Sequence, residues 1–138
     1  FKTERKGVLK MGNVYGAQHV ASYLVYEINE SHGFINNMSL QHLLSAVESK
    51  WQQTFGHSAF KEAVYTANKG YAVKEVFEAY AENAEAHIKL PAKEYYLKYG
   101  TFQLVERTYA IPNFTVEEQQ LVQWIIATNH YKLLKSAS

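Results

Sequence analysis

Histidine is the residue type in this chain best suited to acid–base or metal chemistry, and the chain has six of them. No two of them form the pair at i and i+4, with an intervening Glu, that builds a zinc protease site. The chain also lacks Cys and Asp, which removes thiolate chemistry and reduces the supply of metal-binding carboxylates. A metal-dependent enzyme built from scattered His and Glu is therefore the less favoured reading. The six histidines are His19, His32, His42, His57, His87 and His130.

The other signatures of catalysis are missing from the sequence as well. The seven Gly residues stand singly, so no Gly-rich loop is present to cradle a phosphate. Ser39, Ser45 and Ser58 lack the context of a nucleophile elbow. The charged residues between Lys74 and Glu82 are typical of a solvated helix face. We therefore expect a protein that is not an enzyme and has no catalytic residues, no metal and no cofactor.

Length and composition indicate one globular domain over residues 1–138. Hydrophobic residues make up 47% of the chain and charged residues 20%, as in a protein that folds around one core. The formal net charge of +1 disfavours nucleic acid as the main partner, because binding a phosphate backbone needs a basic surface. No apolar run is long enough to span a membrane, and residues 1–10 lack the apolar segment of a signal peptide. We expect a cytoplasmic protein without membrane contacts, in which residues 1–10 are an N-terminal extension or a first strand.

The elements that would position a site are helices, and one central helix dominates the pattern. Apolar residues recur on one face at i, i+3, i+4, i+7 and i+11, which predicts a helix from Ser39 to about Phe55. Asn37 and Ser39 are the expected caps at its start, and Gly56 is the expected stop. The apolar face consists of Leu40, Leu43, Leu44, Val47 and Trp51.

Further helices are predicted on both sides of the central one. An apolar stripe predicts a helix from Val14 to Ile28 that closes at Gly33. A second stripe predicts a helix from Val73 to Ala84 that faces the central helix. Residues 57–70, between the central helix and the second stripe, form either a short helix or an extended connector.

The last predicted helix has the clearest start in the sequence. Thr115 and Glu118 are spaced as a capping box, in which each side chain bonds the backbone of the other residue. The helix should run to about Lys135. Its expected buried face consists of Leu121, Val122, Ile125, Ile126 and Leu133.

The stretch from residue 84 to residue 112 has no single period. Residues 84–90 are expected to prolong the preceding helix, and residues 92–99 to form a short helix that closes at Gly100. Residues 101–111 are rich in β-branched and aromatic side chains, which favour extended structure. The predicted fold class is therefore mainly α: a compact single-domain helical bundle with a small β-hairpin around residues 101–111.

Three segments of the chain follow the pattern of a known family. Leu-Gln-x-Leu-Leu at 40–44, Phe60 with Glu-Ala-Val at 62–64, and Gly-x-x-Val-x-x-Val at 70–76 resemble the Panacea (SocA-like) antitoxin domain, a phage-associated protein family. The resemblance extends over most of residues 11–134, and residues 84–112 then stand as an insertion suited to partner-specific contacts. His42, Ser45, Ala46 and Tyr71 depart from the family pattern. The matching residues are Leu40, Gln41, Leu43, Leu44, Gly70, Val73, Val76, Ala79 and Tyr80.

The resemblance implies an all-α antitoxin of a toxin–antitoxin system, encoded by a prophage or mobile element. Such a protein neutralises a cognate toxin by direct protein–protein binding and performs no reaction. Toxins of this family include nucleotide-modifying and RNA-modifying enzymes, and some relatives deliver the toxin to a cellular protease. The alternative is a phage-associated interaction or protease-adaptor protein without a toxin partner. The oligomeric state is left open.

Four residues are predicted to bind the partner: Trp51, Tyr65, Tyr71 and Lys74. Trp51 continues the apolar stripe of the central helix, so packing in the core is favoured over partner contact. Tyr71 replaces a family proline beside Gly70, where its side chain is expected to project outward. Aromatic residues dominate binding energy where an interface exists. For Tyr71, a structural role and a partner-binding role are equally favoured.

Overall fold

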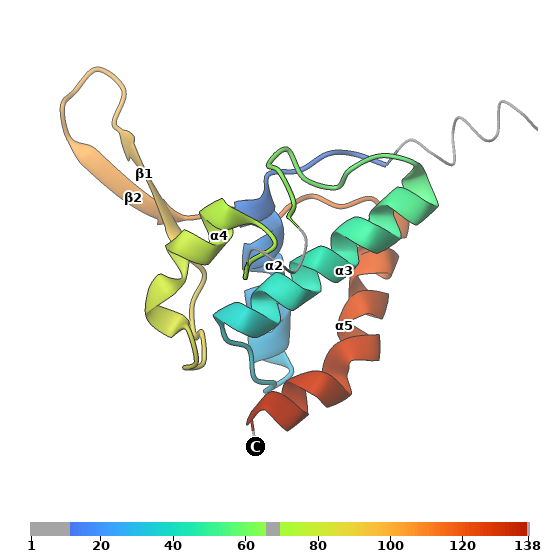
Figure 1. Cartoon of the computed structure of the whole chain (residues 1–138). Helices are drawn as coiled ribbons and strands as arrows, with labels where there is room; N and C mark the ends of the chain where they lie inside the picture. Colours follow the sequence, from blue (N-terminus) through green and yellow to red (C-terminus); the bar gives the residue numbers. More distant parts are fainter. Residues whose placement is uncertain (1–11, 66–69, 138) are drawn as a thin grey trace, which may run out of the picture.

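A computed structural model describes residues 12–65 and 70–137, with side chains described up to residue 129. Over these residues the protein is mainly helical, with four helices packed together and a two-stranded antiparallel hairpin that extends to one side (Figure 1). The predicted extension at residues 1–10 lies outside the described residues. In chain order the elements are α2 (Ala17–Glu30), α3 (Asn37–Phe55), α4 (Lys74–Ala79), the 3₁₀ helix η2 (Ala81–Asn83), β1 (Lys93–Leu97), β2 (Leu104–Thr108) and α5 (Val116–Ala137).

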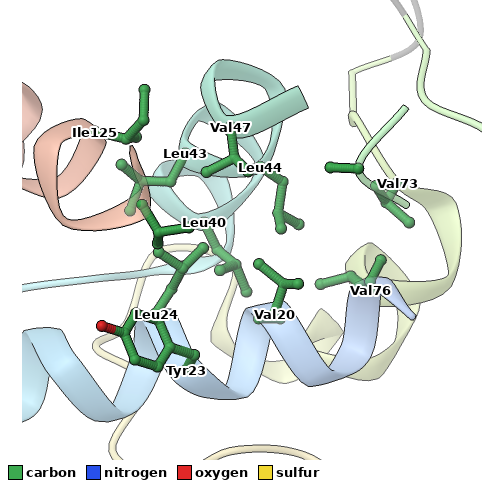
Figure 2. Close-up of a cluster of buried hydrophobic side chains, with 14 of the residues drawn as sticks. Val20, Tyr23, Leu24, Leu40, Leu43, Leu44, Val47, Val73, Val76 and Ile125 are labelled. Carbon is green, nitrogen blue, oxygen red and sulfur yellow. The ribbon is translucent and has the colours of Figure 1, made fainter. Parts of the chain in front are cut away.

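The hydrophobic core forms where the apolar faces of the helices meet. The stripe predicted for the central helix is buried, and Leu40, Leu44 and Val47 are fully enclosed. Figure 2 shows these side chains beside Val20 from α2 and Val76 from α4. The stripe prediction is thus confirmed, because apolar residues at helical spacing share the one face that is turned away from water.

Helix α3 begins two residues earlier than predicted, at Asn37, and its cap is a different residue. Asn36 is the N-cap, and its Oδ1 accepts a hydrogen bond of 2.9 Å from the backbone N–H of Ser39. The expectation that Asn37 and Ser39 cap the helix is therefore wrong, since both already lie in its first turn. Gly56 ends the helix with φ of 83°, as predicted, because glycine adopts this left-handed conformation without strain.

Helix α2 also ends differently from the prediction. Its last residue is Glu30, and His32, rather than Gly33, takes the left-handed conformation with φ of 60°. Gly33 has another role, since a Cβ atom there would lie 3.0 Å from Cγ2 of Ile28. A side chain at this position would press against Ile28, so glycine favours close packing here and is not needed for its φ angle.

The segment after α4 corrects two predictions. Helix α4 stops at Ala79, and one turn of 3₁₀ helix follows, so residues 84–90 do not prolong it. The predicted short helix at 92–99 is wrong, because Lys93–Leu97 forms strand β1 and pairs antiparallel with β2. Pairing satisfies the backbone groups on the facing edges of the two strands, and local helix spacing does not reveal such a partner. The hairpin prediction for 101–111 is confirmed, with Leu104–Thr108 as its second strand.

The base of the hairpin is anchored to the helical body by side chains. The N–H of Ala92 donates to the hydroxyl of Tyr80 at 2.8 Å, and Nδ1 of His19 lies 2.8 Å from the carbonyl oxygen of Ala110. The rings of His19 and Tyr109 meet edge to face, with their centroids 5.4 Å apart. These contacts fix where the hairpin leaves the body.

Helix α5 starts as the sequence predicts and ends two residues later than predicted, at Ala137. The capping box is formed, since the N–H of Thr115 donates to Glu118 at 2.9 Å and the N–H of Glu118 donates to Oγ1 of Thr115 at 3.2 Å. In the predicted apolar face, Leu121, Val122 and Ile125 are buried and Ile126 is half-buried. The side chain of Leu133 lies outside the described residues.

The connector after α3 is not helical over its described part. Phe60 is buried and forms an isolated parallel bridge with Tyr15, so this part of the chain crosses the start of α2 in extended form. Within the part of the chain that the structure describes, no helix combines the length and apolar character needed to span a bilayer.

Leu44→Ala tests the core. Leu44 is fully buried, so we expect the truncation to lower the free energy of unfolding by about 2–5 kcal/mol. Ser49→Ala, on the exposed side of the same helix, is the control and should change it by less than about 0.5 kcal/mol. Urea unfolding followed by circular dichroism measures both, and equal effects would contradict this account of the core.

Candidate functional site

Two of the predicted partner-binding residues come together on the surface. The rings of Tyr65 and Tyr71 meet edge to face with their centroids 5.6 Å apart, and Phe77 lies behind Tyr71 at 5.4 Å. The two tyrosines border an open groove of about 280 Å³, which we call the aromatic groove. It lies between α3 and the turn that leads into α4. Its other lining residues include Met38, Gln41, His42, Ser45 and Ala72.

One side chain of α3 fixes the turn that carries Tyr71. Gln41 is buried, and its Oε1 accepts hydrogen bonds of 2.9 Å from the N–H groups of both Ala72 and Val73. The carbonyl oxygen of Ala72 in turn accepts a 2.8 Å bond from the N–H of Tyr65. The two tyrosines are therefore held on backbone that is tied to the same glutamine.

The same glutamine is held in place by its neighbour one turn earlier. Nε2 of Gln41 donates to Oδ1 of Asn37 at 3.2 Å, and Nδ2 of Asn37 donates to the carbonyl oxygen of Phe77 at 2.9 Å. Gly70 precedes this turn with φ of 83°, and no atom lies within 4 Å of a Cβ built there, so conformation rather than space requires glycine. Two adjacent amides of α3 thus hold both the start and the interior of α4.

The lining of the aromatic groove is suited to contact with apolar side chains. Met38 is 71% exposed and Tyr65 is 38% exposed, although both are large apolar residues. The one imidazole in the lining, His42, is hydrogen-bonded through Nε2 to Oδ1 of Asn129 in α5 at 2.9 Å. Methionine and tyrosine offer large and adaptable contact surfaces. The groove can therefore contact apolar side chains of another molecule.

A wider concavity of about 750 Å³ continues from the aromatic groove along α3. Ser45 and Tyr65 line both hollows, and the second extends to Gln53. Tyr65 therefore stands at the junction of a mainly apolar groove and a more polar one. A partner seated across Tyr65 would contact both.

The other two predicted partner-binding residues lie elsewhere. Trp51 is 1% exposed and packs against Phe55 and Tyr15, and its indole N–H donates to the carbonyl oxygen of Asn13 at 3.1 Å. It belongs to the core, which the sequence pattern favoured, and has no surface to offer a partner. Lys74 is exposed as the first residue of α4 but does not line the aromatic groove among the described residues.

Sequence reasoning missed Met38 and His42 as members of this surface. Together with Ser45 they stand at i, i+4 and i+7, so they follow one another along the side of α3 beside the apolar stripe. That spacing was a usable signal. The spacing could not show that Tyr65 and Tyr71 lie beside these residues, because only the tertiary fold brings the two tyrosines to this side of the helix.

The most developed polar cluster surrounds Glu118 and serves a structural purpose. Its buried carboxylate accepts hydrogen bonds from the hydroxyl of Tyr15 at 2.6 Å, the N–H of Asn13 at 2.6 Å and the N–H of Thr115 at 2.9 Å. Burial alone would raise the pKa of Glu118, but these donated bonds outweigh it and the pKa lies below its ordinary value. Burial and the nearby carboxylate raise the pKa of Tyr15 to about 12.

Two other histidines also act as structural connectors. Nδ1 of His87 accepts from the N–H of Ile35 at 3.1 Å, which leaves the proton on Nε2 to be donated to Oδ1 of Asn29 at 2.7 Å. His19 joins the hairpin to α2, as described above. Among the residues with described positions, no three His, Cys, Asp or Glu gather into a group that could hold a metal ion.

Two of the residues that match the Panacea (SocA-like) pattern, Gln41 and Gly70, line the aromatic groove, and most of the others lie in the core. Gln41 and Val73 are far apart in sequence, yet a hydrogen bond joins them. Comparison of the chain with family models, with curated proteins and with solved structures finds no match.

Gln41→Leu tests the link between α3 and the groove. The substitution keeps the side chain's approximate volume but leaves two buried N–H groups without an acceptor, so we expect a loss of about 1–3 kcal/mol in unfolding free energy. Gln53→Leu makes the same chemical change on the exposed side of α3 and should have little effect. Urea unfolding measures stability, and hydrogen exchange should show faster exchange at Ala72 and Val73. Unchanged exchange at both amides would contradict this role for Gln41.

Glu118→Gln tests the buried carboxylate by its pH dependence. Because the folded-state pKa lies below the ordinary value of 4.5, the stabilisation is complete above that pH and is lost as the pH falls through the folded-state pKa. We expect the variant to be less stable than the parent at about pH 7, and the difference to shrink towards about pH 3. Urea unfolding across this range measures it. Glu117→Gln, at the exposed neighbouring position, should change the profile little.

Proposed function

We propose that this chain is an antitoxin-type protein that neutralises a cognate toxin by direct protein–protein binding, and that the toxin contacts the aromatic groove. One observation carries the proposal: two of the segments that resemble the Panacea (SocA-like) pattern, 40–44 and 70–76, meet at the groove that Tyr65 and Tyr71 border. The resemblance supplies the class of function, and the groove supplies a surface suited to it.

The physical character of the groove supports a binding role. Hot spots of protein interfaces are clustered aromatic and other large side chains in shallow pockets. Here Tyr71 packs between Tyr65 and Phe77, so its ring is already ordered before a partner arrives. Pre-ordering reduces the entropy lost on binding. The hydrogen bonds of Gln41 fix the turn beneath, which keeps the groove in one shape.

The formal net charge of +1 agrees with a protein partner better than with nucleic acid. A toxin that modifies nucleotides or RNA would be inhibited if the bound antitoxin covered its active surface. Delivery of the toxin to a cellular protease would use the same groove for capture. A cytoplasmic location suits both routes, because such toxins act there.

Expression of the neighbouring reading frame tests the proposed function. Expressed alone, the neighbour should arrest growth, and co-expression of this chain should restore it. A pull-down with this chain should retain the untagged neighbour product. A neighbour that is harmless when expressed alone would remove the basis for an antitoxin.

Tyr71→Ala tests the position of the interface. We expect the affinity for the neighbour product to fall by more than about 1 kcal/mol, or roughly fivefold in Kd, with little change in melting temperature. Tyr26→Ala removes an equally large, exposed tyrosine from α2 and should leave the affinity unchanged. Isothermal titration measures both variants. A larger loss for Tyr26 than for Tyr71 would move the interface away from the groove.

A further inference from the structure

The hairpin β1–β2 exposes several large apolar side chains. It extends away from the helices (Figure 1), and Tyr95, Leu97 and Leu104 are each more than half exposed. The register pairs Leu97 with Leu104 and Tyr95 with Glu106, so these side chains lie on one face of the ribbon. Two-stranded ribbons are marginally stable in water, and additional strands stabilise them.

The outer edge of β1 offers unpaired backbone groups. The N–H of Lys98 bonds the carbonyl of Gln103, and the N–H of Tyr109 bonds that of Ala92. Residues 98 and 103, and residues 92 and 109, are thus hydrogen-bonded pairs. Because hydrogen-bonded and non-hydrogen-bonded pairs alternate in an antiparallel ribbon, the even-numbered residues of β1 bond β2, and the backbone groups of the odd-numbered residues point outward. Lys93, Tyr95 and Leu97 therefore present their N–H and C=O groups to solvent, and none has a backbone partner within the described part of the chain.

The charges of the ribbon are already paired with one another. Nζ of Lys93 lies 3.0 Å from Oε1 of Glu106, and Nε of Arg107 lies 2.6 Å from Oε2 of Glu94. The guanidinium of Arg107 also covers the ring of Tyr96 on the opposite face. Because these pairs are satisfied within one hairpin, another strand can approach the edge without leaving a charge unpaired.

A second copy of the same hairpin is complementary to β1 but not to β2. When two β1 strands pair antiparallel over their full length, Tyr95 lies opposite Tyr95, and Lys93 lies opposite Leu97. No like charges meet in this register, and paired aromatic residues stabilise neighbouring strands. The same full-length pairing of two β2 strands would place Glu106 opposite Glu106, which is repulsive.

We propose that two copies of this chain associate through the β1 edges of their hairpins and form a four-stranded antiparallel sheet. The two-fold axis passes between the two Tyr95 residues. The contact is isologous, so it closes at a dimer. In the joined sheet the apolar residues of both hairpins lie on one face, and Tyr95 of each copy packs beside that of the other. This association is independent of the aromatic groove and of the proposed toxin.

Sedimentation of the purified full chain tests the proposal. We expect a concentration-dependent dimer, and Tyr95→Lys should raise its Kd by about tenfold or more, because two lysines would then lie opposite each other at the axis. The new lysine faces Glu106 within its own hairpin, so the hairpin itself is retained. Tyr99→Lys, the same change at the exposed tip, is the control and should leave the dimer intact.

Cross-linking tests the register, and the absence of native cysteine makes single-cysteine variants unambiguous. Tyr95→Cys should form a disulfide-linked dimer on mild oxidation, because paired residues at this position would have Cα atoms about 5.5 Å apart. Tyr99→Cys and Thr108→Cys, at the tip and on the other edge, should cross-link far more slowly. The mass of a single chain up to about 1 mM would overturn the proposal. Faster cross-linking at 108, or a Tyr95→Lys variant that only loses affinity for the neighbour product, would also overturn it.

Discussion

The rest of the structure depends on two hydrogen bonds that the side-chain oxygen of Gln41 accepts. The donors are the consecutive backbone N–H groups of Ala72 and Val73. A buried N–H group without an acceptor is strongly destabilising, so this contact sets where the chain must pass after the connector. From that point Val73 and Val76 enter the core, and Tyr71 is turned towards the surface beside Tyr65. The side-chain amides of Gln41 and Asn37 on α3 thus hold α4 in position and support the aromatic groove.

Buried and half-buried carboxylates hold the irregular segments in a similar way. Glu62 accepts from the N–H of Ala17 at the start of α2, Glu48 accepts from the N–H of Ala59 after α3, and Glu118 gathers donors at the start of α5. Backbone groups outside helices and strands need acceptors just as those inside do. The carboxylates of Glu48, Glu62 and Glu118 are thus already used as hydrogen-bond acceptors for loops and helix ends.

The protein therefore has two surfaces of different origin. The aromatic groove is formed where the core helices meet, since the residues that shape it also connect α3 to α4. Both strands of the hairpin are mostly exposed, and Tyr80 and His19 join the base of the hairpin to the helices. A mutation in the groove perturbs both shape and stability unless it is confined to outward-facing rings, whereas the hairpin can change with little consequence for the helices.

The sequence by itself determined the helices whose signals are local. The apolar stripe of α3, its stop at Gly56 and the capping box of Thr115 and Glu118 all act within a few residues, so their spacing predicts them. The strand at 93–97 was decided by tertiary structure. The cap at Asn36 is a local hydrogen bond across three residues, and the sequence interpretation placed it at Asn37 and Ser39 instead. Tyr65 and Tyr71 were recognised singly by residue type, but their meeting beside Met38 was not. Hydrogen bonds and strand pairs between residues far apart in the chain depend on where the whole fold brings each segment, and no local spacing records that.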